Sequence, residues 1–172
     1  WFHKYGISQL TYNIIGLPHE DIHRALKTIK LNARIKSDRT IANIFYPYPG
    51  TKLYDIAKEA GYLPDVIPPD CRVPLRQEQF PEHEVLFIEA YFMHFVKRYK
   101  WAFAMPRWLG RPYERFLDFR VTSRIVPHKF LVWVHDRYMG GRNKLRDFLV
   151  NHMPSLYLKL RMLRHHKRAK KN

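Results

Sequence analysis

The sequence predicts an α/β segment followed by a mostly α-helical, basic extension. Residues 7–17 are rich in β-branched and aromatic side chains and run into a Gly-Leu-Pro turn, which is typical of a buried strand. Residues 40–48 have the same character and end at a Pro-Gly turn. Between them, residues 18–36 place apolar side chains at helical spacing opposite a basic face. A strand, a helix and a second strand in this order predict parallel pairing with a right-handed crossover.

Further helices are predicted on both sides of a proline-rich connector, residues 65–74. Thr51 is a suitable N-cap for a short helix that Gly61 ends. Residues 81–103 carry acidic side chains at their start, basic ones near their end and apolar ones along one side, as a long helix does. Proline and glycine separate the remaining expected helices, which cover residues 112–121, 127–139, 142–151 and 154–167.

Composition and charge narrow the classes to which the chain can belong. With 46% hydrophobic residues, the 172-residue chain can bury a core. Its single cysteine, Cys71, excludes an internal disulfide framework and favours a reducing, cytoplasmic location. No apolar run approaches the roughly 18 to 20 residues that cross a bilayer. Residues 1–65 carry a net charge of +3 and residues 66–172 a net charge of +13, which favours a polyanionic partner for the second part.

Two motifs carry a resemblance to a known family. Residues 14–20 have the sequence IIGLPHE and resemble the pattern IxGLPGE, and residues 45–54 have the sequence FYPYPGTKLY and match FxPYPGTxLY. On these motifs, residues 1–64 resemble the C-terminal part of radical S-adenosylmethionine enzymes. The sequences GLPHED and YPYPGT are similar to those of the cobalamin-binding-domain subgroup, which includes anaerobic magnesium-protoporphyrin monomethyl ester cyclases. Tyr12 and His19 stand where the family often has glycine.

The resemblance implies a fold and a division of the chain. It implies that residues 1–64 are the last two β/α units of a partial TIM-type barrel. The connector, residues 65–74, would then lead to a helical basic extension, residues 75–172. Two such units cannot close a barrel, so we expect this chain to be completed by an N-terminal part of the same polypeptide.

The resemblance also implies a binding site for S-adenosylmethionine at the two strand ends. In the family, an isoleucine of the first motif packs against adenine and the backbone of the second motif reaches the adenine edge. Glycine lets the chain approach the ligand closely, and prolines stiffen the turn. Glu20 is equally well explained as a carboxylate at a helix N-terminus. The candidate cofactor-binding residues are Ile14, Gly16, Glu20, Phe45, Tyr46 and Pro47.

The cysteines that the chemistry needs are not in this sequence. In the family, a C-x-x-x-C-x-x-C loop holds the 4Fe–4S cluster that cleaves S-adenosylmethionine reductively, whereas this chain has only Cys71. No D-x-H-x-x-G motif for cobalamin occurs either, although the subgroup suggests cobalamin as a further cofactor. We therefore expect the chain alone to be inactive, and we assign it no catalytic or metal-binding residue.

Several alternatives remain open from sequence. His19 and His23 have the spacing of a metal-binding pair on a helix, but a solvated helix face explains them without a third ligand. The aromatic and basic region 91–138 suits a helical cap, a cover for a large apolar or anionic substrate, or a surface for polyanions or membranes. The alternative function is a non-catalytic basic module that binds nucleic acid or an anionic membrane surface, which would place the chain peripherally on a membrane.

Overall fold

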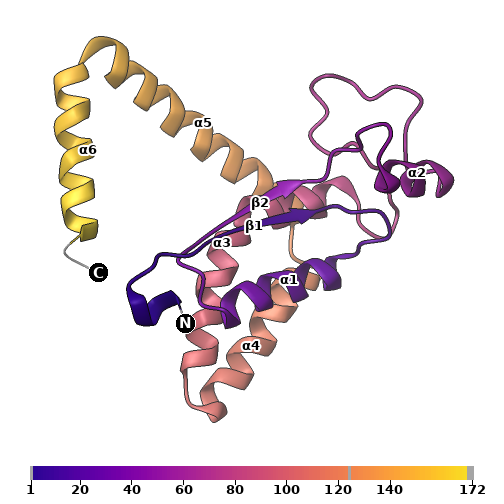
Figure 1. Ribbon diagram of the computed structural model, residues 1–172, viewed down its shortest axis with the longest axis horizontal. Helices are drawn as coiled ribbons and strands as arrows, with labels where there is room; N and C mark the ends of the chain where they lie inside the picture. The colour runs from indigo at the N-terminus through magenta and orange to yellow at the C-terminus, as the bar shows by residue number, and fades with distance from the viewer. Residues whose placement is uncertain (1, 124, 170–172) are drawn as a thin grey trace. The chain divides into compact units, whose positions relative to one another are not determined.

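The computed structural model describes residues 2–123 and 125–169, which form two strands, six α-helices and one 3-10 turn (Figure 1). The strands lie early in the chain, and long helices dominate its second half. In chain order the elements are a 3-10 turn at Phe2–Tyr5, β1 at Leu10–Ile15, α1 at Ile22–Arg34, β2 at Arg39–Ile44, α2 at Lys52–Glu59, α3 at Glu82–Ala104, α4 at Arg107–Thr122, α5 at His128–His152 and α6 at Pro154–Ala169.

The first half of the chain has the predicted local structure. β1 and β2 pair in parallel, in register from Leu10 beside Arg39 to Ile15 beside Ile44, and α1 crosses between them. The side chain of Thr51 caps α2 by accepting a hydrogen bond from the Tyr54 amide at 3.3 Å. The strands, the crossover helix, the parallel pairing and the cap are therefore confirmed.

The predicted fold class is wrong. Helix accounts for 61% of the chain, and the sheet has only two parallel strands, which is not a partial TIM-type barrel with two β/α units. The long helix α3 packs against α1 and β2 as well as α4, so a segment assigned from sequence to a separate extension helps to cover the sheet. Periodicity located both strands and the helices of the first half, but it does not report which elements pack on a sheet.

The core lies between the inner face of the sheet, α1, α3 and α4. Ile15 of β1 and Ile29 of α1 are fully buried, and α3 contributes the largest share of the apolar side chains. From α3 these are Val85, Phe87, Ile88, Phe92, Phe95, Val96, Tyr99 and Ala102. The sequence of α3 is apolar on more than one side, and the helix buries several aromatic rings.

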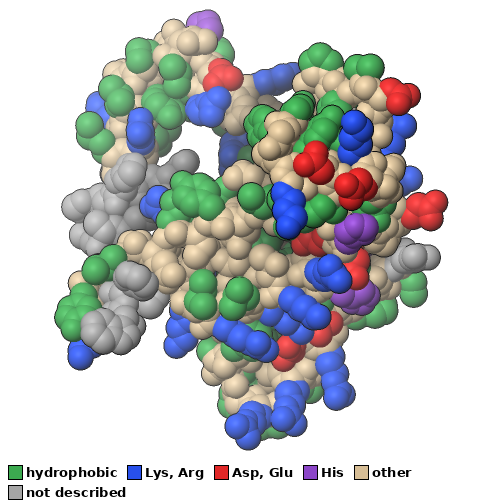
Figure 2. Space-filling model, turned by 45° about the vertical axis from the view of Figure 1, so that its right-hand side comes forward, with side chains coloured by type: hydrophobic (Ala, Val, Ile, Leu, Met, Phe, Trp, Pro, Cys, Tyr) green, Lys and Arg blue, Asp and Glu red, His purple; other side chains and the backbone are tan. Residues whose placement is uncertain are grey.

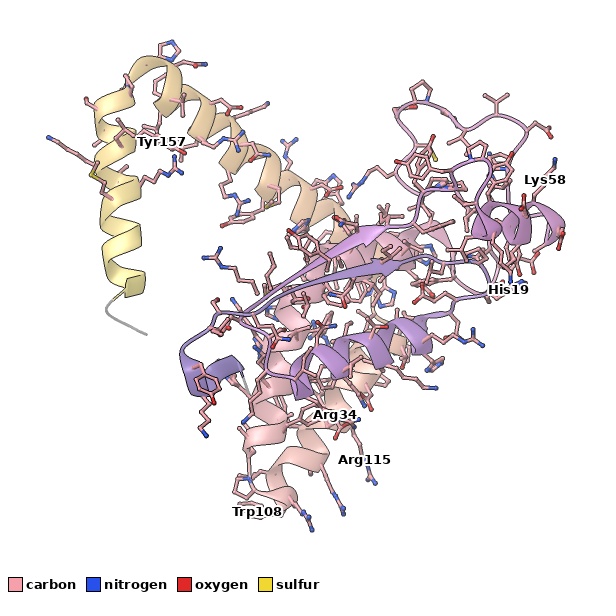
Figure 3. The ribbon with its side chains drawn as sticks, viewed as in Figure 1. His19, Arg34, Lys58, Trp108, Arg115 and Tyr157 are labelled. Carbon is pink, nitrogen blue, oxygen red and sulfur yellow. The ribbon has the colours of Figure 1, made fainter. Side chains whose placement is uncertain are left out.

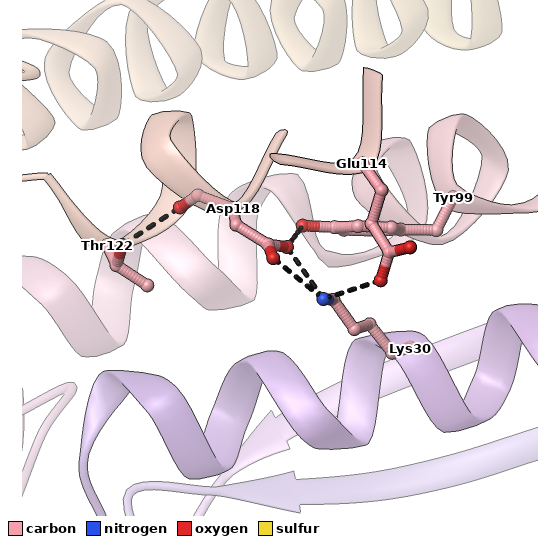
Figure 4. Close-up of polar contacts among 5 residues, drawn as sticks. All are labelled: Lys30, Tyr99, Glu114, Asp118 and Thr122. Carbon is pink, nitrogen blue, oxygen red and sulfur yellow. Dashed lines mark hydrogen bonds and ion pairs between the residues drawn. The ribbon is translucent and has the colours of Figure 1, made fainter. Parts of the chain in front are cut away.

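A partly buried polar network joins three helices beside this core (Figure 4). Lys30 of α1 donates hydrogen bonds to Glu114 at 2.8 Å and to Asp118 at 2.9 Å, both on α4. The hydroxyl of Tyr99, on α3, donates to Asp118 at 2.7 Å. Burial alone lowers the pKa of Lys30, but its hydrogen bonds with Asp118 and Glu114 outweigh that effect and raise it. Lys30 therefore stays charged and fixes α4 beside α1.

The chain divides into two compact units, Trp1–Val132 and Trp133–Asn172. The resemblance to the enzyme family implied a different division, into residues 1–64, 65–74 and 75–172. The second unit consists of the greater part of α5, followed by α6. α5 runs without a break through Gly140-Gly141, where the sequence predicted an interruption. Glycine weakens a helix without ending it, so this prediction was wrong.

Candidate cofactor-binding site at the strand ends

The turn after β1 is closed by one buried carboxylate. Oε2 of Glu20 accepts hydrogen bonds from the amides of Gly16 at 2.6 Å and Leu17 at 3.0 Å. Gly16 has a φ of +76°, a backbone conformation that residues other than glycine rarely adopt. Burial raises the pKa of Glu20, and the two amide hydrogen bonds oppose that rise. The contacts of Glu20 are therefore with its own turn, where it determines the shape of the loop.

A second set of contacts comes from residues later in the chain and holds the same turn. Oε1 of Gln77, a residue only 5% exposed, accepts a hydrogen bond from the His19 amide at 2.8 Å, and its Nε2 donates to the Leu17 carbonyl at 3.0 Å. The hydroxyl of Tyr62 lies 3.0 Å from Nδ1 of His19. The sequence did not point to Gln77, because nothing in the segment after the proline-rich connector marks one glutamine as the partner of a turn 58 residues away.

Removing the Glu20 carboxylate is expected to loosen this turn. We expect Glu20→Ala to lower the free energy of unfolding by about 1–3 kcal/mol, since two buried amides lose their acceptor. Glu20→Gln keeps an acceptor oxygen and removes a buried charge, so its stability is expected to equal or exceed that of the parent protein. Urea unfolding of both variants at neutral pH tests this contrast. Equal losses in the two variants would contradict the assigned hydrogen bonds.

The outer face of the sheet is open and largely apolar. Ile14 is 55% exposed and Tyr12 69% exposed on β1, and Ile41 is 40% exposed on β2. Each strand also has one edge with no strand beside it in the part of the chain that the structure describes. Parallel sheets are normally covered on both faces, and two-stranded sheets are marginal alone. The open face is therefore a surface that further polypeptide can cover.

The structure brings some of the six candidate residues together and turns others inward. The Phe45 amide donates to the Ile15 carbonyl at 2.8 Å, which holds the two strand ends side by side. Ile14 and Tyr46, the latter 45% exposed, lie on the surface at this edge, while Pro47 is buried. The Phe45 ring is 8% exposed and packs in a small cluster of its own with Ala57 and Leu75 of later segments.

The exposed side chains at this edge are therefore apolar and aromatic. Side chains of Ile14 and Tyr46 are available there beside a rigid turn, whereas the side chains of Phe45 and Glu20 are not. The ring of Tyr48 lies 5.2 Å from that of Tyr46, centroid to centroid, and extends the aromatic surface beyond β2. In Figure 3, His19 of the turn and Lys58 of α2 lie at the same end of the first unit, away from Trp108.

No metal site is found within the described residues. They contain no group of three His, Cys, Asp or Glu side chains that could hold an ion. His19 contacts Tyr62, and the Cys71 thiol donates to the Val73 carbonyl at 3.2 Å. A cleft of about 790 Å³ lies between the start of α1, residues 78–84 and the junction of α4 and α5, and none of the six candidate residues lines it. The strand-end surface is thus separate from this cleft.

No protein-family model, curated protein or solved structure matches this chain. Within the described residues, none of the helices combines the length and apolar character that a bilayer crossing requires.

Proposed function

We propose that this chain contributes part of the S-adenosylmethionine site of a radical S-adenosylmethionine enzyme. Other residues of a longer polypeptide would hold the 4Fe–4S cluster and cover the open face of the sheet. The observation that carries the proposal is the pairing of two parallel strand ends whose motifs meet at one edge. The carboxyl ends of parallel strands are where α/β proteins commonly bind ligands.

The available groups suit an adenosine moiety. An adenine ring needs an apolar surface on one side and backbone polar groups at its edge. Ile14 and Tyr46 provide exposed apolar surface, and the Gly16 turn is held by Glu20 and Gln77 before any ligand arrives. A preorganised turn lowers the entropy cost of binding. The residues that act on the ligand directly are therefore expected to be Ile14, Tyr46 and the neighbouring backbone, with Glu20 as a positioning residue.

The proposed parent enzyme would need further cofactors and a reducing location. The cluster would supply the electron that cleaves S-adenosylmethionine, and none of the described residues of this chain forms a ligand group for it. Cobalamin is a further cofactor of the proposed parent enzyme, bound outside this chain. One cysteine and an oxygen-sensitive cluster suit the reducing cytoplasm. The parent enzyme would then perform hydrogen abstraction or cobalamin-assisted methyl transfer.

Titration of the isotopically labelled chain with S-adenosylmethionine tests the proposal. Because only part of the site is present, we expect weak binding, with a Kd on the order of 1 mM. Amide NMR shifts are expected at Gly16, Leu17 and Tyr46. Ile14→Asp is expected to abolish them, because it places a charge where adenine packs.

A matched variant controls for changes to the exposed sheet. Leu10 lies on the same face of β1 as Ile14, at the opposite end of the strand, and is 43% exposed. Leu10→Asp is expected to leave the shifts unchanged. The proposal is wrong if no amide near Gly16 responds to the ligand, or if Leu10→Asp abolishes the response as completely as Ile14→Asp does.

A further inference from the structure

The turn between α3 and α4 exposes four large apolar side chains. Trp108 is 73% exposed and Trp101 62% exposed, and Met105 and Leu109 are 40% and 45% exposed. All four flank the short connection between two packed helices, so they project from one end of a helical hairpin. We call these four residues the hairpin tip. Exposed tryptophan and leucine at adjoining positions form a surface that water solvates poorly.

Arginines adjoin the hairpin tip on the outer face of α4. Arg107, Arg111 and Arg115 are exposed and recur every four residues, so they lie along one side of the helix. With Trp108 and Pro112 they line a shallow depression of about 670 Å³. Lys and Arg side chains gather at the lower end of Figure 2, and Figure 3 places Trp108 and Arg115 at the corresponding end of the first unit.

The acidic residues of α4 do not neutralise this face. Glu114 and Asp118 both bind Lys30 of α1, at 2.8 Å each, on the side of α4 that packs in the core. Lys30 thereby engages both carboxylates on the inner side of α4, and the outer side of the helix is cationic. A helix with this division presents positive charge and aromatic rings to the same partner.

We propose that the hairpin tip and the three arginines dock on the surface of an anionic lipid bilayer. Tryptophan and leucine insert at the level of the lipid headgroups, and arginine binds phosphate there. A duplex nucleic acid supplies phosphate too, but it gives exposed Met105 and Leu109 no apolar partner. The lipid surface therefore accounts for both halves of the patch. This inference does not depend on the proposed S-adenosylmethionine site.

Flotation of the protein with vesicles tests the docking. We expect binding to phosphatidylglycerol/phosphatidylcholine vesicles that weakens with added salt, and little binding to phosphatidylcholine alone. Arg111→Gln combined with Arg115→Gln is expected to lower the partition coefficient roughly 30-fold. Trp108→Ala is expected to lower it roughly tenfold, because an inserted apolar ring is lost. Circular dichroism establishes that each variant is folded.

Matched variants separate a local surface from general basicity. Lys52→Gln combined with Lys58→Gln, on exposed positions of α2, removes the same charge and is expected to reduce binding less than about threefold. Trp133→Ala removes a tryptophan of similar exposure, 60%, from α5 and is expected to have no effect.

Three results would overturn the proposal. One is a loss from Trp133→Ala as large as that from Trp108→Ala, which would assign docking to α5. Another is equal binding to neutral and anionic vesicles. The third is an absence of vesicle binding together with tight binding of duplex DNA that requires Arg111 and Arg115.

Discussion

Replacing Gly110 with alanine is expected to lower the free energy of unfolding by about 3 kcal/mol and the melting temperature by roughly 6–12 °C. Gly110 lies in the first turns of α4, where the helix crosses the end of α3. A Cβ added there would lie well under 3.0 Å from the carbonyl oxygen of Ala102. That oxygen belongs to the backbone of α3, so α3 and α4 must move apart to admit a methyl group.

Thermal and urea unfolding followed by circular dichroism measure this effect, and α5 offers a matched control. Gly141 also lies inside a helix, and a Cβ added there would meet nothing within 4 Å. Gly141→Ala is therefore expected to be neutral or to stabilise its helix by up to about 1 kcal/mol. If Gly110→Ala were as harmless as Gly141→Ala, the close crossing of α3 and α4 would be incorrect.

Replacing Lys30 with methionine is expected to cost about 2 kcal/mol at neutral pH. The Lys30 side chain is 18% exposed, and its ammonium is the shared partner of Glu114, 29% exposed, and Asp118, 36% exposed. Without the cation, two partly buried carboxylates repel each other beside the buried hydroxyl of Tyr99. Partial exposure to water keeps this cost below that of a fully buried pair.

Further variants separate the effect of charge from the effect of packing. Adding Glu114→Gln and Asp118→Asn to Lys30→Met is expected to restore most of the stability at neutral pH. Lys27→Met, at an exposed position of the same helix, is expected to change stability by less than about 0.5 kcal/mol. A deficit that persists in the triple variant would contradict this explanation.

Local structure could be predicted from sequence wherever one segment contains its own signals. The change from strand to helical periodicity located β1, α1 and β2, and Thr51 and Gly61 marked the two ends of α2. α4 begins at Arg107, earlier than the predicted residue 112, and Pro112 lies inside it. Proline and glycine were expected to end helices, but α4 contains Gly110 and Pro112 and α5 contains Gly140-Gly141, so packing and helix propensity can outweigh such residues.

The candidate site was predictable only in part. The motifs predicted a site at the two strand ends. The structure places Ile14 and Tyr46 on the surface there and buries the Phe45 ring. The role of Glu20 as the acceptor that closes its own turn follows from distances, as does the contribution of Gln77. A motif records which residue types occur together, but not which side of a turn each side chain faces.

The sequence by itself determined the order of the elements, the parallel pairing of the strands, and the basic, aromatic character of the second half. Tertiary structure alone decided that α3 covers the sheet, that Lys30 binds the acidic residues Glu114 and Asp118 of α4, and that the arginines of α4 remain on its outer side. The physical reason is the range of the interactions. Periodicity and caps act within a few residues, whereas the packing of α3 and the partners of Lys30, 84 and 88 residues away, depend on how distant segments meet.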